Sequence, residues 1–253
     1  MRPRHSLWWT LAAGLVLVAC GAGTAGNPVK APPTSTVLFQ MSVPNPTIND
    51  GFDEIVQIFE FAPGSWTAMH SHGGPGLVTV VSGEVTERIG SSERVFKTGQ
   101  SWTDGAGTAH QVGNTTGSPA LTVATLMISK GAAVTTPVTG AAAPALLAVN
   151  KVQAKLAQPA VPGAFDLVRT GYEFAPGAWT PLQKQAGPGL MIVVDGEVTV
   201  REQGAEKVYT AGQTWVEPTG NAYQAGNRGQ SPARVVINGL VPEGSSPMAT
   251  VNS

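Results

Sequence analysis

The chain has 253 residues, a formal net charge of -1 and only 12% charged residues. This length allows one large domain or two domains of about 100 to 125 residues, and the balanced charge gives no basis for a nucleic-acid partner. Thirty-one glycines and twenty prolines favour a turn-rich, all-β protein over a helical one.

Residues 1–19 are typical of a signal peptide, because Arg2 and Arg4 precede an apolar run too short to span a bilayer comfortably. The run ends in Leu17-Val18-Ala19-Cys20, which resembles the bacterial lipoprotein signal, in which the cysteine becomes the lipidated first residue. An ordinary secretory peptide is the alternative. Cys20 is the only cysteine, so no intramolecular disulfide can form. We therefore expect secretion across the cytoplasmic membrane and a lipid anchor at Cys20, on the periplasmic or the outer side of the cell envelope.

The rest of the chain is an internal duplication. Residues 20–36 are small, polar and proline-rich, which predicts a flexible tether. When the chain is laid on itself, 37–128 aligns with 150–241 without a gap, and 16 of the 26 positions between residues 60 and 85 are identical in the second copy. These copies predict an N-terminal and a C-terminal domain, joined by a linker at 129–149 and followed by a tail at 242–253.

Each copy consists of short β-rich runs separated by turn residues. The run 79–81 stops at Ser82-Gly83 and resumes at 84–86, and Asp195-Gly196 interrupts the second copy at the same place. Such a pair between two β-rich runs predicts a tight hairpin. Many short strands without a long helical period predict a β-sandwich or barrel in each copy.

Two motifs of the first copy have the spacing of the cupin family motifs. The first is Gly64-x5-His70-x-His72-x3-Gly76-x6-Gly83, with Gly76 where the family has a glutamate. The second is Gly99-x5-Gly105-x-Gly107-x2-His110-x3-Asn114, with Gly105 in place of a proline. The second copy keeps most of the glycines but has Gln183, Gln185, Gly189 and Tyr223 at the ligand positions. The chain thus resembles a bicupin, which implies two tandem jelly-roll (cupin) β-barrels.

Three histidines are the candidate metal ligands. Residues i and i+2 of a strand project from one face, so His70 and His72 place two imidazoles side by side, and His110 of the second motif adds a third. The chain has only one other histidine, His5, in the leader. Three neutral imidazoles bind Fe, Zn, Ni or Cu and leave coordination positions open. We expect one divalent transition metal, with Mn less favoured because no carboxylate is expected; hydrogen-bonded core histidines are the alternative.

The missing glutamate affects the predicted chemistry. With Gly76 at this position the metal is held by neutral ligands only, and the most obvious general base is lost. Glu84 is no clear replacement, because Glu197 occupies the same place in the copy that lacks histidines.

The second copy has no comparable ligand set. Gln183, Gln185 and Tyr223 are poor ligands for a transition metal, but they can hydrogen-bond an organic ligand or one another. We favour a structural role for them.

Two hypotheses about function follow. One is a metalloenzyme of the dioxygenase or isomerase type, acting on a small oxygenated substrate. The other is a lipoprotein that binds a metal or small ligand without turnover. The expected partners are the membrane, through lipidated Cys20, and a small-molecule ligand or substrate; the sequence leaves a homo-oligomer open.

Overall fold

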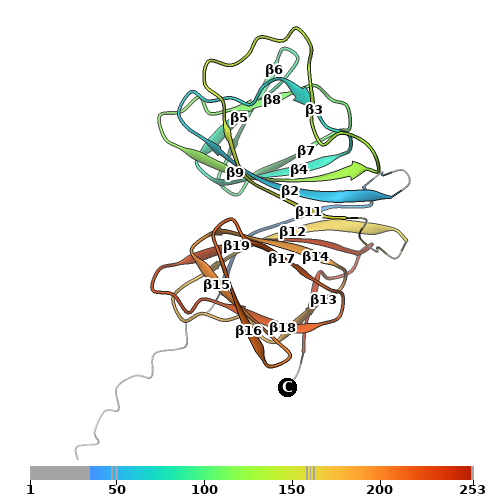
Figure 1. The fold of residues 1–253 in the computed structure, drawn as a ribbon, viewed down its shortest axis with the longest axis vertical. Helices are drawn as coiled ribbons and strands as arrows, with labels where there is room; N and C mark the ends of the chain where they lie inside the picture. The colour runs from blue at the N-terminus through green and yellow to red at the C-terminus, as the bar shows by residue number, and fades with distance from the viewer. Residues whose placement is uncertain are drawn as a thin grey trace, which may run out of the picture. The chain divides into compact units, whose positions relative to one another are not determined.

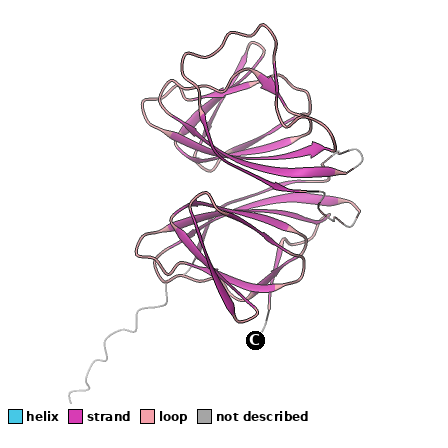
Figure 2. Ribbon diagram, viewed as in Figure 1, coloured by secondary structure: helices cyan, strands magenta, loops and turns pink. Residues whose placement is uncertain are grey.

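The computed structural model describes residues 35–46, 48, 51–157, 159, 161 and 163–251. Within these residues every regular element is a β-strand, as Figure 2 shows, which confirms the all-β prediction. The described part therefore contains no helix of the length and hydropathy that a membrane span needs. The signal peptide, Cys20 and nearly all of the predicted tether lie outside the described residues.

The first barrel is built from two facing sheets and a short strand pair (Figure 1). All its paired strands are antiparallel. The five-stranded sheet has the order β11 (Val149–Leu156), β2 (Phe52–Phe61), β9 (Ala120–Ser129), β4 (Gly76–Ser82), β7 (Ser101–Asp104). The three-stranded sheet has the order β6 (Ser92–Lys97), β5 (Glu84–Ile89), β8 (Gln111–Gly113), and the pair is β10 (Thr136–Pro137) with β3 (His70–Ser71).

The second barrel repeats this arrangement with two five-stranded sheets. One has the order β1 (Ser35–Val43), β12 (Phe165–Phe174), β19 (Ala233–Pro242), β14 (Gly189–Asp195), β17 (Thr214–Glu217). The other has the order β16 (Ala205–Thr210), β15 (Glu197–Glu202), β18 (Ala222–Gly226), β13 (Gln183–Gln185), β20 (Met248–Thr250). The prediction of two tandem jelly-roll barrels is therefore confirmed.

The two barrels exchange their first strands. β1 precedes the first barrel in sequence but pairs with β12, and Gln40 lies opposite Thr170. β11 begins the second repeat but pairs with β2, and Gln153 lies opposite Gln57. Residues 37–43 and 150–156, which the repeat assigned to their own copies, thus each cover an edge of the other copy's sheet. An edge strand that is covered in this way no longer exposes unpaired backbone groups.

The five-stranded sheets face each other and bury an apolar layer between the barrels (Figure 1). Phe52 and Phe165, which occupy equivalent positions of the two repeats, stack with ring centroids 5.5 Å apart. Val56 and Val123 of the first barrel pack in the same cluster as Leu190 of the second. The duplication therefore produces two barrels that share one core at their interface.

A buried arginine crosses this interface. The Arg169 side chain is completely buried and donates to the Asn238 side chain at 2.9 Å, to Thr79 Oγ1 at 2.8 Å, to Thr125 Oγ1 and to the Val123 carbonyl at 2.7 Å. Three of these four partners belong to the first barrel, whereas Arg169 and Asn238 belong to the second. The guanidinium thus joins the two barrels through directional bonds as well as through apolar contact.

The predicted tight hairpins at Ser82-Gly83 and Asp195-Gly196 are wrong. β4 and β5 flank Gly83 but lie in different sheets, so the chain turns a corner of the barrel there. Gly83 has φ +78°, and a Cβ at this residue would lie 2.6 Å from the Pro119 carbonyl oxygen. Glycine is required because the corner combines a left-handed backbone with a close approach of another strand.

The segments expected to be a linker and a tail pack on the barrels. Within 129–149, β10 pairs with β3, and the Trp66 amide donates to the Leu146 carbonyl at 2.9 Å. Within 242–253, β20 pairs with β13 at the equivalent place of the second barrel. The sequence did not predict this packing, because these segments are rich in small and polar residues and have no alternating apolar pattern.

Candidate metal centre

The backbone brings His70 and His110 together. The amide of each donates to the carbonyl of the other, at 2.9 and 2.8 Å, so the first residue of β3 is joined to the residue before β8. Their ring centroids lie 4.5 Å apart, and the centroid of His72 lies 4.8 Å from that of His70 and 5.1 Å from that of His110. The structure thus gathers the three histidines that the sequence motifs singled out.

One nitrogen of each imidazole is held by a backbone carbonyl. The distances from Nδ1 are 2.7 Å to Ala68 O, 2.8 Å to Val134 O and 3.0 Å to Thr108 O, for His70, His72 and His110 respectively. A carbonyl oxygen can only accept a hydrogen bond, so each Nδ1 carries the proton and each Nε2 keeps a free lone pair. Hydrogen bonds of this kind orient histidine ligands toward a metal.

Burial keeps these imidazoles neutral. It lowers the pKa of all three below the ordinary value of 6.5, and that of His72 to about 4, where the neighbouring imidazoles lower the pKa further. A neutral imidazole is the form that coordinates a metal. One nitrogen from each of the three residues can be chosen so that all lie within 4.8 Å of one another, and among the described residues these three form the cluster suited to an ion. The donor set therefore fits a divalent transition metal.

Asp104 also reaches this site, although no sequence motif pointed to it. This residue ends β7 and lies directly opposite Gly76 of β4, and its Oδ2 is 3.7 Å from Nε2 of His110. The side chain is buried, and burial raises the pKa of its carboxyl. The second copy also has an acid here, Glu217, opposite Gly189, and an acid that both copies keep did not single out Asp104 in the sequence.

Two further groups lie near Asp104. Burial and the Asp104 carboxyl together raise the pKa of Glu87 to about 7, while Arg94 opposes the shift through a hydrogen bond of 2.8 Å from its Nε. The nearby indole of Trp102 lowers the pKa of the Asp104 carboxyl, against the larger effect of burial. Neither group meets the geometry of a hydrogen bond to Asp104, whose two oxygens have no hydrogen-bond partner among the described residues.

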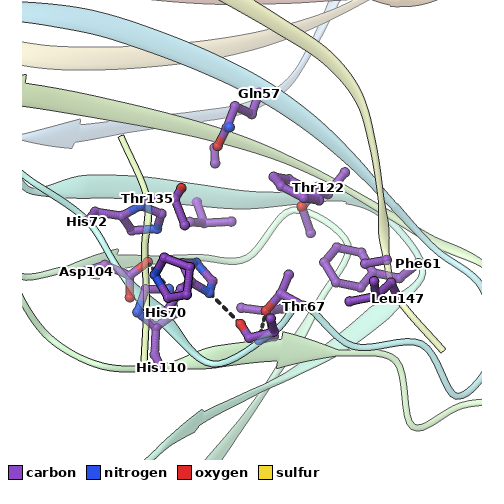
Figure 3. Close-up of a pocket in the computed structure, with 17 residues that line it drawn as sticks. Gln57, Phe61, Thr67, His70, His72, Asp104, His110, Thr122, Thr135 and Leu147 are labelled. Atoms are coloured by element: carbon purple, nitrogen blue, oxygen red, sulfur yellow. Dashed lines mark hydrogen bonds and ion pairs between the residues drawn. The ribbon is translucent and has the colours of Figure 1, made fainter. Parts of the chain in front are cut away.

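The histidines lie at one end of a cavity of about 240 Å³. Figure 3 shows the imidazoles and Asp104 at this end and Phe61, Thr122 and Leu147 at the other. Most of the wall is apolar, with Gln57, Thr67, Thr122 and Thr135 as its polar members besides the site itself. The segment 129–149 contributes Thr135, Pro137, Leu147 and Ala148 to the wall. A small, largely apolar molecule with a polar end matches this lining.

In the second barrel, the two glutamines at the equivalent positions both donate a hydrogen bond to the Tyr223 hydroxyl. Gln183 Nε2 lies 3.3 Å and Gln185 Nε2 lies 2.6 Å from the Tyr223 hydroxyl oxygen, and all three residues are buried. The second barrel has larger buried side chains at positions where smaller residues line the cavity of the first. Val78, Thr122 and Ala124 of the first barrel correspond to Met191, Val235 and Ile237, all buried in one cluster. This geometry favours the structural role that the sequence indicated for Gln183, Gln185 and Tyr223.

Solved structures with the same fold share little sequence with this chain. AerE from Microcystis aeruginosa is 14% identical with a TM-score of 0.53, over 83% of this chain and 98% of that one. A mutant oxalate decarboxylase from Bacillus subtilis is 10% identical with a TM-score of 0.56, over 83% and 79%. The Lactobacillus farciminis oxalate decarboxylase is 11% identical with a TM-score of 0.54, over 84% and 88%. At these identities the likeness concerns the fold.

A comparison with curated protein sequences gave no match. The cupin domain family, in contrast, matches residues 57–128 and 172–238, one segment in each barrel and together more than half of the chain. The chain therefore belongs to the cupin family and is a bicupin with a three-histidine cluster in its first barrel.

Proposed function

We propose that this bicupin binds one divalent transition metal through His70, His72 and His110 and uses it on a small, largely apolar substrate with an oxygen donor. The observation that carries the proposal is the position of three free Nε2 atoms at the polar end of an apolar cavity. A metal bound there would act as a Lewis acid or activate oxygen. The chain's own residues would hold the metal, orient the substrate and shield it from water.

The residues that line the cavity indicate which class of substrate it can bind. No lysine or arginine is among the described residues that line the cavity, so an anionic group finds its counter-charge only at the metal. Oxalate is a small dianion without an apolar part. The apolar walls formed by Phe61, Val112 and Leu147 therefore make no favourable contact with it. We infer a substrate with one donor end, such as a hydroxyl or keto group, and an apolar body.

Metal analysis tests the first half of the proposal. The full chain, purified with detergent and exposed to Fe²⁺, Zn²⁺, Ni²⁺, Cu²⁺ or Mn²⁺ in turn, should retain about one ion per chain, whereas His70→Ala/His72→Ala should retain none. If the two proteins hold equal amounts of every metal, the proposal fails. Oxygen consumption with diols and diketones on the iron-loaded protein then separates an enzyme from a binder.

We also propose that the protein is a lipoprotein of the cell envelope, anchored at Cys20. The support is the leader sequence, with two arginines, an apolar run and Leu17-Val18-Ala19-Cys20. Cys20→Ser should release the protein from the membrane fraction or leave the precursor unprocessed. Unchanged membrane association with normal processing would contradict the anchor.

A further inference from the structure

Gly76 and Asp104 occupy neighbouring places on two paired strands. They lie directly opposite each other in the β4–β7 ladder, so their side-chain positions are on the same face of the sheet. A Cβ added to Gly76 would lie 3.8 Å from the Cβ of Asp104 but only 2.7 Å from Cδ2 of Leu126. The space next to Gly76 is thus occupied by Leu126, while Asp104 supplies a carboxylate from the strand beside it.

The Asp104 carboxylate is buried without a hydrogen bond of acceptable geometry, and its polar neighbours are His110, Glu87 and Trp102. Both of its oxygens are inaccessible to solvent and lack a hydrogen bond among the described residues, and the side chain is 1% exposed. Arg94, a nearby cation, is engaged by Glu87. Burying an acid in this way is unfavourable unless a cation or a hydrogen-bond donor compensates it.

The neighbour of this carboxylate is a second acceptor. Asp104 Oδ2 lies 3.7 Å from Nε2 of His110, and that nitrogen has a lone pair because Nδ1 donates its proton to the Thr108 carbonyl. Two ligands that are each about 2.1 Å from a tetrahedral ion are about 3.4 Å apart. For this one pair of acceptors, the separation of 3.7 Å is therefore slightly longer than a shared tetrahedral ion requires.

We propose that Asp104 is a fourth protein ligand of the metal, so that the carboxylate missing at residue 76 is supplied by the paired strand. This inference rests on the proposed metal site at His70, His72 and His110. A carboxylate gives the site one negative charge and a hard oxygen donor, which Mn²⁺ and Fe²⁺ prefer more than Cu²⁺ does. The reason that the sequence offered against Mn, the lack of a carboxylate, no longer holds.

The second barrel provides an internal control. Glu217 lies opposite Gly189 as Asp104 lies opposite Gly76, and one of its oxygens is likewise buried without a partner among the described residues. The residues at the ligand positions of this barrel, Gln183, Gln185 and Tyr223, are not a metal-binding set. If the acid at this position served only the packing of a cupin barrel, Asp104 and Glu217 would respond alike to substitution.

The experiment compares Asp104→Asn, Asp104→Glu and Glu217→Gln with the unsubstituted full chain. Dissociation constants are measured for Mn²⁺ and Zn²⁺, and the visible spectrum is recorded with Co²⁺, which reports on the ligands without any turnover. Asp104→Asn should weaken Mn²⁺ binding by about 100-fold or more and change the Co²⁺ spectrum, since loss of a direct ligand exceeds the roughly 10- to 100-fold effect of removing a residue that only supports a ligand. Asp104→Glu should recover part of the affinity, and Glu217→Gln should leave it unchanged.

Each outcome has a separate meaning. Unchanged metal affinity and an unchanged Co²⁺ spectrum in Asp104→Asn, with the protein folded by circular dichroism, overturn the fourth ligand but leave the three-histidine site intact. An equal loss of affinity in Asp104→Asn and Glu217→Gln also overturns it, because the effect is then one of packing. If the unsubstituted protein binds no more metal than His70→Ala/His72→Ala, the proposed function itself fails. If Asp104→Asn does not fold, Asp104→Glu decides: a changed Co²⁺ spectrum together with weaker Mn²⁺ binding than in the unsubstituted protein supports the fourth ligand, and an unchanged spectrum and affinity overturn it.

Discussion

The backbone carbonyl of Val134 accepts the Nδ1 proton of His72 at 2.8 Å, so the segment between the two repeats orients a side chain of the three-histidine cluster. Ala68 and Thr108 provide the same support for His70 and His110 from within the first repeat. The centre is therefore preorganised by three backbone carbonyls, one of which belongs to a segment outside the aligned repeat.

This arrangement predicts the tautomer of each histidine. In the metal-free protein at pH 8, all three imidazoles should carry the proton on Nδ1, because a carbonyl cannot donate to them. Long-range proton–nitrogen correlation spectra of a ¹⁵N-histidine sample distinguish the two tautomers. An Nε2–H signal from His70, His72 or His110 would contradict the orientation described above.

The lowered pKa of His72 predicts how stability depends on pH. Its folded pKa is about 4 and its ordinary value is 6.5, so between these limits the unfolded chain binds a proton that the folded chain does not. The free energy of unfolding therefore falls as the pH drops from about 6.5 to 4, by up to about 3 kcal/mol from this group.

Replacement of His72 by the glutamine found in the second copy isolates this contribution. In urea unfolding with a chelator present, the stability of His72→Gln relative to the unsubstituted protein should rise as the pH falls from about 6.5 to 4. Parallel stability curves for the two proteins over this range would refute the assignment.

Arg169 is expected to dominate the polar part of the barrel interface. Arg169→Ala leaves Asn238, Thr79 and Thr125 without their common donor and opens a cavity, so it should reduce the free energy of unfolding by about 3 to 5 kcal/mol. Arg228→Ala, which removes an exposed ion pair with Glu206, should change the stability far less, because solvent screens exposed pairs. Urea unfolding of both variants checks the difference, and equal losses would argue against a special role for Arg169.

A larger residue at position 124 is expected to block substrate binding without affecting metal binding. Ala124 lines the cavity, and the corresponding residue of the second barrel is the buried Ile237. Ala124→Ile should therefore narrow the cavity while leaving the histidines in place. With Co²⁺ bound, azide should change the visible spectrum of both proteins, whereas 4-methylcatechol should change only that of the unsubstituted one. A 4-methylcatechol response that survives in Ala124→Ile would place the binding site elsewhere.

The residue patterns were sufficient for the fold class and the three histidines. The alternation of short β-rich runs, the internal repeat and the spacing of His70, His72 and His110 are local features or simple self-similarity, and both can be read along a chain. The comparison of the two copies also separated the shared framework from the residues that differ. In the structure, Gln183 and Gln185 each donate a hydrogen bond to the Tyr223 hydroxyl.

Three features depended on the tertiary structure. The corner at Gly83 has the residues of a hairpin turn. It is not a hairpin, because β4 and β5 pair with strands of different sheets, and only the structure shows this. The exchange of β1 and β11 could not be predicted from the sequence. Because the two copies have similar sheets, the sequence does not tell which copy a strand will pair with. Asp104 is far from Gly76 along the chain, and the register of two paired strands, which no local pattern encodes, put its carboxylate opposite the position where the motif lacks one.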